Sequence, residues 1–199
     1  MRGSALLVAL VALVALTASS TAQAEDESHA PTARKTGWVD IFATAFVGDG
    51  LRFNNPYRLS TVLGSDAQSL SRTAVYADLG GALVLGDPLT LAHGLSLRAS
   101  ISMEGVPQAV MTPAYLVFHR WGQWGAYGRA GAAIVLTPDT TWGFEGAAGG
   151  VWFPRAGIGI AAELVGDVFY GAGTQDVQVA TYPVLSAEGG LWLSWEALP

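Results

Sequence analysis

The ionisable side chains that could do chemistry in this chain are few and widely spaced. Its 199 residues include 16 Asp or Glu, 10 Lys or Arg and 3 His, and no cysteine. The lack of cysteine excludes thiol catalysis, disulfides and cysteine-bound zinc. The net charge of −6 argues against a nucleic-acid partner, because a phosphate backbone attracts basic surfaces. Ionic contacts between scattered acids and arginines are the chemistry that remains.

All but one of the charged residues inside the alternating segments of residues 37–196 fall on one side, and opposite charges stand on neighbouring segments. Arg98 lies beside Asp78 in this arrangement, and Arg129 lies beside Glu145. Buried charges are tolerated when partners of opposite sign compensate them. The predicted ion-pair network consists of Asp40, Asp78, Arg98, Arg129, Glu145, Glu163, Asp167 and Glu188.

Two further ionisable residues stand close together in the segment Phe118-His119-Arg120-Trp121. We expect His119 to share the polar side with the network. Arg120 is the one charge assigned to the apolar side, and it stands near a segment end. A long side chain in that position can extend to lipid headgroups.

The segments that must position these charges have apolar residues at every second position, which is typical of β-strands. In residues 94–104, Leu95 and Leu97 share one side, while Ser96 and Arg98 share the other. Most segments are longer than the strands of soluble proteins, which cluster near about 5–6 residues. We predict eight strands, at 37–47, 73–85, 94–104, 113–121, 124–136, 142–153, 156–170 and 182–195.

The composition of the two sides indicates which one faces lipid. The polar side carries about one charge per segment, which is too few to solubilise the exterior of a water-soluble barrel. The other side is an unbroken apolar band. In hydrocarbon every backbone donor and acceptor must be paired, so strands can cross only as a closed barrel. The sequence therefore predicts an all-β fold, a closed up-and-down antiparallel transmembrane β-barrel of eight strands.

The N-terminal residues have the pattern of a secretory signal peptide. Arg2 precedes twelve uninterrupted apolar residues at 5–16, and Ala22-Gln23-Ala24 is a small-x-small cleavage pattern. Twelve helical residues span about 18 Å, too short for a bilayer core of about 30 Å. We predict a signal peptide at 1–24 with cleavage near Ala24, a flexible leader at 25–36 and a barrel domain at 37–196.

The connections and the tryptophans predict the orientation. With both termini in the periplasm, the turns 86–93, 122–123 and 154–155 lie on the periplasmic side, and the outer loops are 48–72, 105–112, 137–141 and 171–181. Tryptophan is enriched at membrane–water interfaces. The predicted interface girdle consists of Trp38, Trp121, Trp124, Trp152, Trp192 and Trp195 at the periplasmic rim and Trp142 at the outer rim.

On signal peptide, strand number, alternation and girdle, residues 36–196 resemble the small eight-stranded outer-membrane barrels of the OmpA/OmpX type. The resemblance implies a place in the outer membrane of a Gram-negative-type bacterium. It also implies contact with outer-membrane lipid and lipopolysaccharide, and with the barrel assembly machinery during biogenesis. Such proteins usually end on an aromatic residue of the last strand, and here Trp195 stands four residues before the end.

Three functions remain open at this stage. An eight-stranded barrel has an interior that side chains can just fill, so we expect a lumen plugged by the ion-pair network and a structural or surface-interaction role. The acid excess would also suit a narrow cation-selective channel. A third possibility is a lipid A-modifying enzyme of the outer membrane.

The histidines argue against the enzyme. Such chemistry needs a histidine, a serine and an acid near the outer leaflet. His29 lies in the leader, His93 in a periplasmic turn and His119 near a periplasmic strand end. The sequence also has no metal-ligand spacing and no phosphate-binding loop. We therefore expect no catalytic residue, no metal and no cofactor.

Overall fold

The computed structural model describes residues 39–53, 70–87, 89–138, 140–172 and 180–198. These residues belong to the compact unit Thr36–Pro199. The predicted signal peptide, the leader and Trp38 lie outside the described residues, as do parts of the long connections. No helix within the described ranges is long and apolar enough to cross a membrane.

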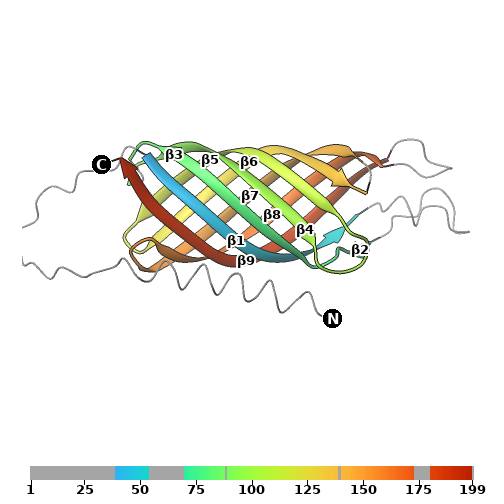
Figure 1. Ribbon diagram of the computed structural model, residues 1–199, viewed down its shortest axis with the longest axis horizontal. Coiled ribbons are helices and arrows are strands. Elements are labelled where there is room, and N and C mark those ends of the chain that lie inside the picture. Colours follow the sequence, from blue (N-terminus) through green and yellow to red (C-terminus); the bar gives the residue numbers. More distant parts are fainter. Residues whose placement is uncertain (1–38, 54–69, 88, 139, 173–179, 199) are drawn as a thin grey trace, which may run out of the picture. The chain divides into compact units, whose positions relative to one another are not determined.

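The described chain consists of eight long β-strands and one very short strand, β2 (Figure 1). The short strand pairs only with the end of β1. The strands are β1 (Val39–Arg52), β2 (Ser71–Arg72), β3 (Tyr76–Leu85), β4 (Ala92–Ser102), β5 (Ala109–Trp121), β6 (Trp124–Thr137), β7 (Thr141–Arg155), β8 (Ile158–Ala172) and β9 (Ala180–Leu198).

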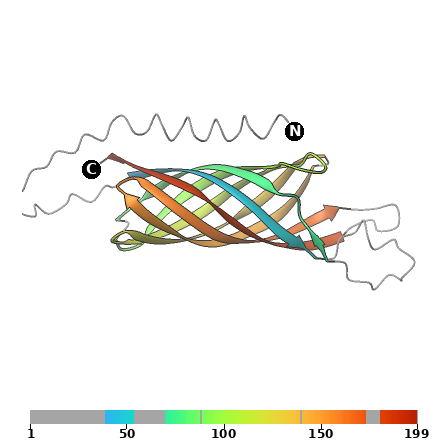
Figure 2. The same cartoon turned by 90° about the horizontal axis from the view of Figure 1, so that it is seen from below.

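The long strands form a closed antiparallel barrel. Each pairs with its neighbour in sequence, and β1 pairs with β9 to close the sheet. Figure 2 shows the strands crossing the barrel at a common tilt. We call the end with the connections 86–91, 122–123 and 156–157 the turn end, and the opposite end the loop end. Closure pairs the backbone groups of both strands that would otherwise form edges, as predicted for a transmembrane fold.

Several strands extend beyond their predicted limits. Strand β1 continues past residue 47, because residues 48–52 still pair with residues 184–188 of β9. Strand β5 begins at Ala109 rather than 113, and β9 continues to Leu198 rather than 195. The alternation of side chains fades near these ends, whereas the backbone ladder does not depend on it.

The tight turn between β7 and β8 lies two residues later than predicted. Pro154 and Arg155 belong to β7, and the chain turns at residues 156–157. Gly157 has a φ of 77° and Gly122, in the turn between β5 and β6, has a φ of 60°. Residues with a side chain rarely adopt this conformation, so each turn is located by its glycine.

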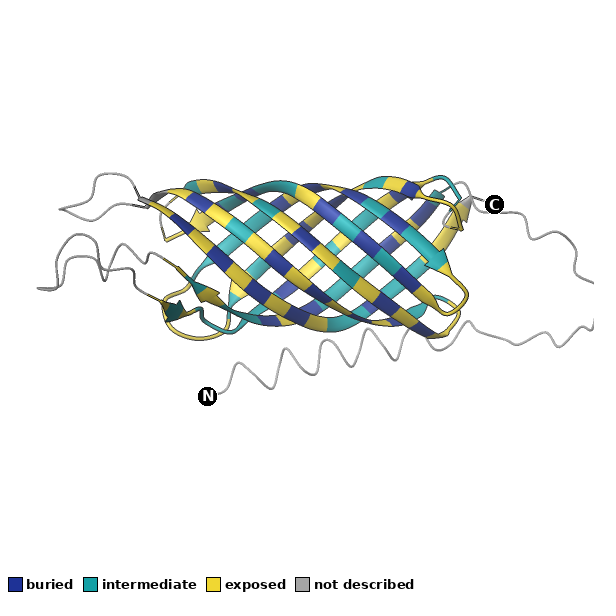
Figure 3. Ribbon diagram, turned by 180° about the vertical axis from the view of Figure 1, so that it is seen from behind, coloured by how far each residue is buried: buried dark blue, intermediate teal, exposed yellow. Residues whose placement is uncertain are grey.

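Buried and exposed residues alternate along the strands, because successive side chains of a strand face opposite sides of the sheet (Figure 3). The outward face is apolar and exposed: Leu95 retains 69% of its surface, Phe144 65% and Leu164 62%. Asp78, Arg98 and other polar residues are buried on the inward face. A water-soluble barrel has the reverse arrangement, so the distribution matches a barrel surrounded by lipid.

On strand β5, the side chains of His119 and Arg120 lie on the opposite faces to those predicted. Its inward positions include the buried residues Leu116 and Phe118, so Arg120 faces inward with its guanidinium carbon 4.4 Å from the centre of the Phe153 ring. His119 faces outward, where Nδ1 contacts the carbonyl oxygen of Thr90. Large apolar residues occupy both faces of this strand, so alternation alone did not identify its polar side.

Two glycine-to-alanine variants test this assignment of faces. At Gly131 an added Cβ would meet the carbonyl oxygen of Pro113 and lie 2.6 Å from the Cα of Ala114. At Gly146, on the outward face, it would meet no atom within 4 Å. We expect Gly131→Ala to lower the free energy of unfolding by about 1–3 kcal/mol and Gly146→Ala to leave it nearly unchanged. Urea unfolding of the barrel in lipid vesicles measures both; equal effects would contradict the assignment.

Candidate functional site

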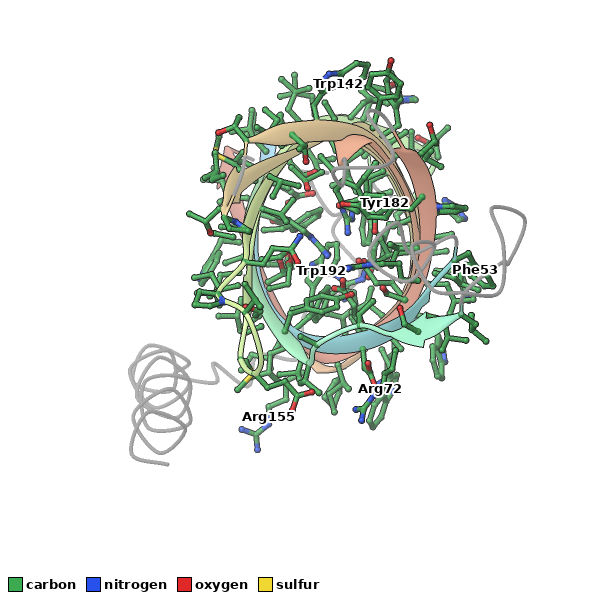
Figure 4. All side chains as sticks on the ribbon, turned by 90° about the vertical axis from the view of Figure 1, so that its right-hand side faces the viewer. Phe53, Arg72, Trp142, Arg155, Tyr182 and Trp192 are labelled. Atoms are coloured by element: carbon green, nitrogen blue, oxygen red, sulfur yellow. The ribbon has the colours of Figure 1, made fainter. Side chains whose placement is uncertain are left out.

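The polar residues of the barrel gather in its lumen in levels that follow one another along the axis. Figure 4 looks into the barrel from the loop end and shows Tyr182 and Trp192 inside the ring of strands, with Trp142 and Arg155 outside it. An aromatic layer lies nearest the turn end, an ionic network follows, and a cavity lies at the loop end. Sequence order alone does not reveal these levels, because each combines residues from several strands.

The aromatic layer consists of Phe42, Phe118, Tyr127 and Trp192, all buried. The Trp192 ring centre lies 5.0 Å from that of Phe42 and 4.6 Å from that of Tyr127, and Phe42 lies 5.1 Å from Phe118. Such distances are typical of packed aromatic pairs. These rings belong to a larger apolar cluster that includes Val151.

The sequence pattern assigns Trp192 to the interface girdle, and the structure corrects this: Trp192 lies in the lumen. Only 2% of its surface is exposed. It occupies the same face of β9 as Glu188, four residues earlier, since positions an even number apart share a face. Its position near the end of a strand favours an interface residue, whereas the alternation of inward and outward residues along β9 places it inside.

The ionic network centres on Glu163. Arg98 donates to both of its carboxylate oxygens, at 2.6 and 3.0 Å, and Nη2 of Arg129 donates to Oε1 at 2.8 Å. The side chain of Glu163 has no exposed surface. A buried carboxylate held by two guanidinium groups through charge-assisted hydrogen bonds is a strong arrangement.

The same two arginines hold three further acids. Arg98 Nη1 lies 3.3 Å from Glu188 Oε2 and 3.4 Å from Asp78 Oδ1, and Arg129 Nη1 contacts Glu145. Glu163 and Glu188 are also register partners on β8 and β9, so Arg98 separates two carboxylates that would otherwise repel. The structure thus brings together six of the eight residues predicted for the network.

Neutral hydroxyl groups complete the network, and sequence reasoning missed them. Tyr127 donates to Glu163 at 2.7 Å, and Tyr76 donates to Glu188 at 2.8 Å. Shorter side chains satisfy two other acids: Ser100 donates to Asp78 at 2.5 Å, and Thr112 to Glu145 at 2.9 Å. These residues occupy inward positions. Their place on the polar side of the alternating strands is the one signal in the sequence that could have identified them.

The two remaining predicted members, Asp40 and Asp167, occupy separate places. Asp40 is buried near the turn end, and Phe42 is the next inward residue of β1 towards the network. Asp167 lies on the loop-end side of Glu163, across from Glu145 in the register of β7 and β8. Its Oδ1 is buried without a hydrogen-bond partner among the residues that the structure describes.

A cavity of about 90 Å³ lies next to the network at the loop end. Residues from six strands contribute its polar lining, among them Arg52, Tyr76, Ser100, Glu145, Asp167 and Glu188. Phe169 contributes an aromatic ring. We call this space the loop-end cavity.

The other described tryptophans of the predicted girdle face outward. Trp121, Trp124, Trp152 and Trp195 are exposed at the turn end. Trp142 is exposed at the loop end, where its ring centre lies 5.8 Å from that of Tyr170. The barrel therefore presents aromatic rings at both ends of its apolar band, as interface residues of membrane barrels do.

Comparison with solved structures identifies the fold. The chain is similar to Ail, the attachment invasion locus protein of Yersinia pestis, with a TM-score of 0.50 and 11% identity over 80% of this chain and 99% of that one. The chain has the fold of the small eight-stranded outer-membrane barrels. Neisserial surface protein A matches over 77% of this chain and 96% of its own, with 10% identity and a TM-score of 0.49. No family model and no curated protein sequence matches.

The described histidines have structural contacts at the turn end. His93 Nδ1 lies 2.6 Å from the hydroxyl of Tyr115, and the two rings stack with centres 6.0 Å apart. His119 contacts Thr90 and lies against Trp121. Among the described residues, no three His, Cys, Asp or Glu side chains are grouped as metal ligands would be.

Removal of Arg129 tests the energetic weight of the network. Arg129→Ala leaves Glu145 and Glu163 without one of their cations, so we expect a loss of about 3–5 kcal/mol in the free energy of unfolding. Arg72→Ala is the matched control, because Arg72 pairs with Asp49 on the exposed surface, where an ion pair contributes about 0–1 kcal/mol. Urea titration in vesicles compares the two; similar losses would show that the network carries no special weight.

Proposed function

We propose that this chain is a bacterial outer-membrane barrel with a closed lumen and a structural or surface-interaction role. The layered lumen is the observation that carries the proposal. Aromatic rings and a bonded ionic network fill the barrel at successive levels, and neither level leaves space comparable to the loop-end cavity. The exposed apolar band supports the membrane location, as does the signal-peptide pattern ending at Ala24.

The plug is expected to stop ions for two reasons. A permeating ion would have to pass between the packed rings of Phe42, Phe118 and Trp192, where it would lose its hydration. It would also have to separate Glu163 from two arginines, each bonded at less than 3 Å. This favours a closed barrel over the narrow cation channel.

The surface role is assigned to the loop end. The longer connections lie there, and lipopolysaccharide is the partner proposed for them and for the aromatic rim around Trp142. The outer-membrane lipid contacts the apolar band, and the assembly machinery acts on the strands during insertion. We propose no catalytic role, since His93 and His119 face outward at the opposite end and are engaged with Tyr115 and Thr90.

Conductance in planar bilayers tests the closed lumen. We expect the inserted protein to give no steady unit conductance at neutral pH, because the aromatic layer and the ionic network both block the path. Resistance to added protease confirms insertion in the same preparation. A steady cation-selective conductance would contradict the plug and support the channel.

Cell fractionation tests the location. We expect the mature protein to begin near Glu25, to enter the outer-membrane fraction and to need detergent for extraction. An unheated sample should migrate faster on a denaturing gel than a boiled one, because a closed barrel resists unfolding. Protein that stays dissolved without detergent would contradict a lipid-facing exterior.

A further inference from the structure

Asp167 differs from the other acids that face the network and the loop-end cavity. Asp78, Glu145, Glu163 and Glu188 each accept a hydrogen bond from a side chain on another strand. Asp167 Oδ1 is buried and accepts none from any described residue, and none of the ion pairs described in the lumen includes this side chain. A buried carboxylate oxygen that the described residues leave unsatisfied is open to a partner such as an ordered water or a bound ligand.

The charge around the cavity favours a cation as that partner. The network and the cavity lining hold five acids and three arginines. Arg98 and Arg129 are already shared among four of the acids, and the third, Arg52, lies against the ring of Tyr182 with 5.3 Å between its guanidinium carbon and the ring centre. Asp167 therefore remains as the acceptor for an added positive charge.

The surroundings of Asp167 match an ammonium group. Glu145 is its register partner on β7, and Ser186 on β9 pairs with Val165, the inward neighbour of Asp167. Both Glu145 and Ser186 line the cavity, as does the ring of Phe169, the next inward residue of β8. An ammonium has three donors and no acceptor, and an aromatic face attracts it.

The size of the cavity limits the ligand. A volume of about 90 Å³ corresponds to about three water molecules, at about 30 Å³ each in the liquid. We propose that the loop-end cavity binds a primary ammonium group of a small molecule, with Asp167 as its counter-ion. The occupant lies on the loop-end side of the plug, so binding requires no passage through the barrel.

Contact with Arg52 would distinguish two classes of ligand that carry an ammonium group, a simple amine and a zwitterion. Arg52 and Asp167 both pair with Val184, from its two sides, and both line the cavity. The Nε of Arg52 is buried without a hydrogen-bond partner. A zwitterion with a carboxylate beside its amine would engage Arg52 as well as Asp167, whereas a simple amine would engage Asp167 alone.

Nuclear magnetic resonance of the full mature protein in non-ionic detergent tests the proposal. Methylammonium chloride is titrated at pH 7 and constant ionic strength, with sodium chloride and sodium acetate as matched titrations. We expect saturable shifts confined to residues that line the cavity with methylammonium and none with the other two salts. Asp167→Asn should weaken this binding about tenfold or more, the effect of losing one charge-assisted hydrogen bond.

Asp49→Asn is the matched control, because it removes one negative charge at the same end outside the cavity, where Asp49 pairs with Arg72. It should bind methylammonium as the parent does. Titration with glycine in place of methylammonium separates the two classes of ligand. If Arg52→Gln weakens the binding of glycine but not that of methylammonium, the site takes a zwitterion. Unsaturable shifts in the parent, or equal binding by the folded Asp167→Asn protein, would overturn the proposal; the unheated gel mobility verifies folding.

Discussion

The carboxylate of Glu163 is the point at which the barrel is tied across its own interior. Backbone pairing connects each strand only to its neighbours, whereas Glu163 on β8 bonds to Arg98 on β4 and Arg129 on β6. Two cations on one buried anion offset the cost of removing all three groups from water. The lumen is thereby held to one cross-section. Tyr127 donates a further hydrogen bond to Glu163, and Ser100 donates one to Asp78.

The lumen differs on the two sides of this network, so the turn end and the loop end of the barrel interior are not equivalent. Towards the turn end, the rings of Phe42, Tyr127 and Trp192 exclude water, which strengthens each ionic contact beneath them. Towards the loop end, the buried apolar cluster is smaller, and two of its members, Phe169 and Val184, line the loop-end cavity. Asp167 belongs to none of the ion pairs described for Arg98 and Arg129, and it faces the loop end, where solvent or a ligand is able to compensate its charge.

The sequence predicts the barrel well because its fold depends on alternation, which a single strand displays. Leu95 and Leu97 against Ser96 and Arg98 indicate one lipid face whatever the partners are. Contacts between strands that are not neighbours, such as Arg98 with Glu163, depend on the closure and stagger of the sheet, and no spacing in the sequence encodes them. Alternation also fails where both faces are apolar, as in β5, and where an aromatic residue fits either environment. Trp192 is such a residue, since tryptophan packs in buried cores as well as at interfaces, and here it is buried.

The abundance of glycine follows from the same narrow lumen. Inward glycines stand directly against large rings: a Cβ at Gly149 would lie 2.6 Å from the Tyr127 hydroxyl, and one at Gly125 would lie 3.0 Å from the Phe118 ring. An eight-stranded barrel has just enough interior for its side chains, so each large ring needs a position without a side chain opposite it. Gly125 and Gly149 thus complement the rings of the aromatic layer. Towards the loop end, smaller side chains such as Val184 and Ser186 are part of the lining, and the lumen is left partly unfilled as the loop-end cavity.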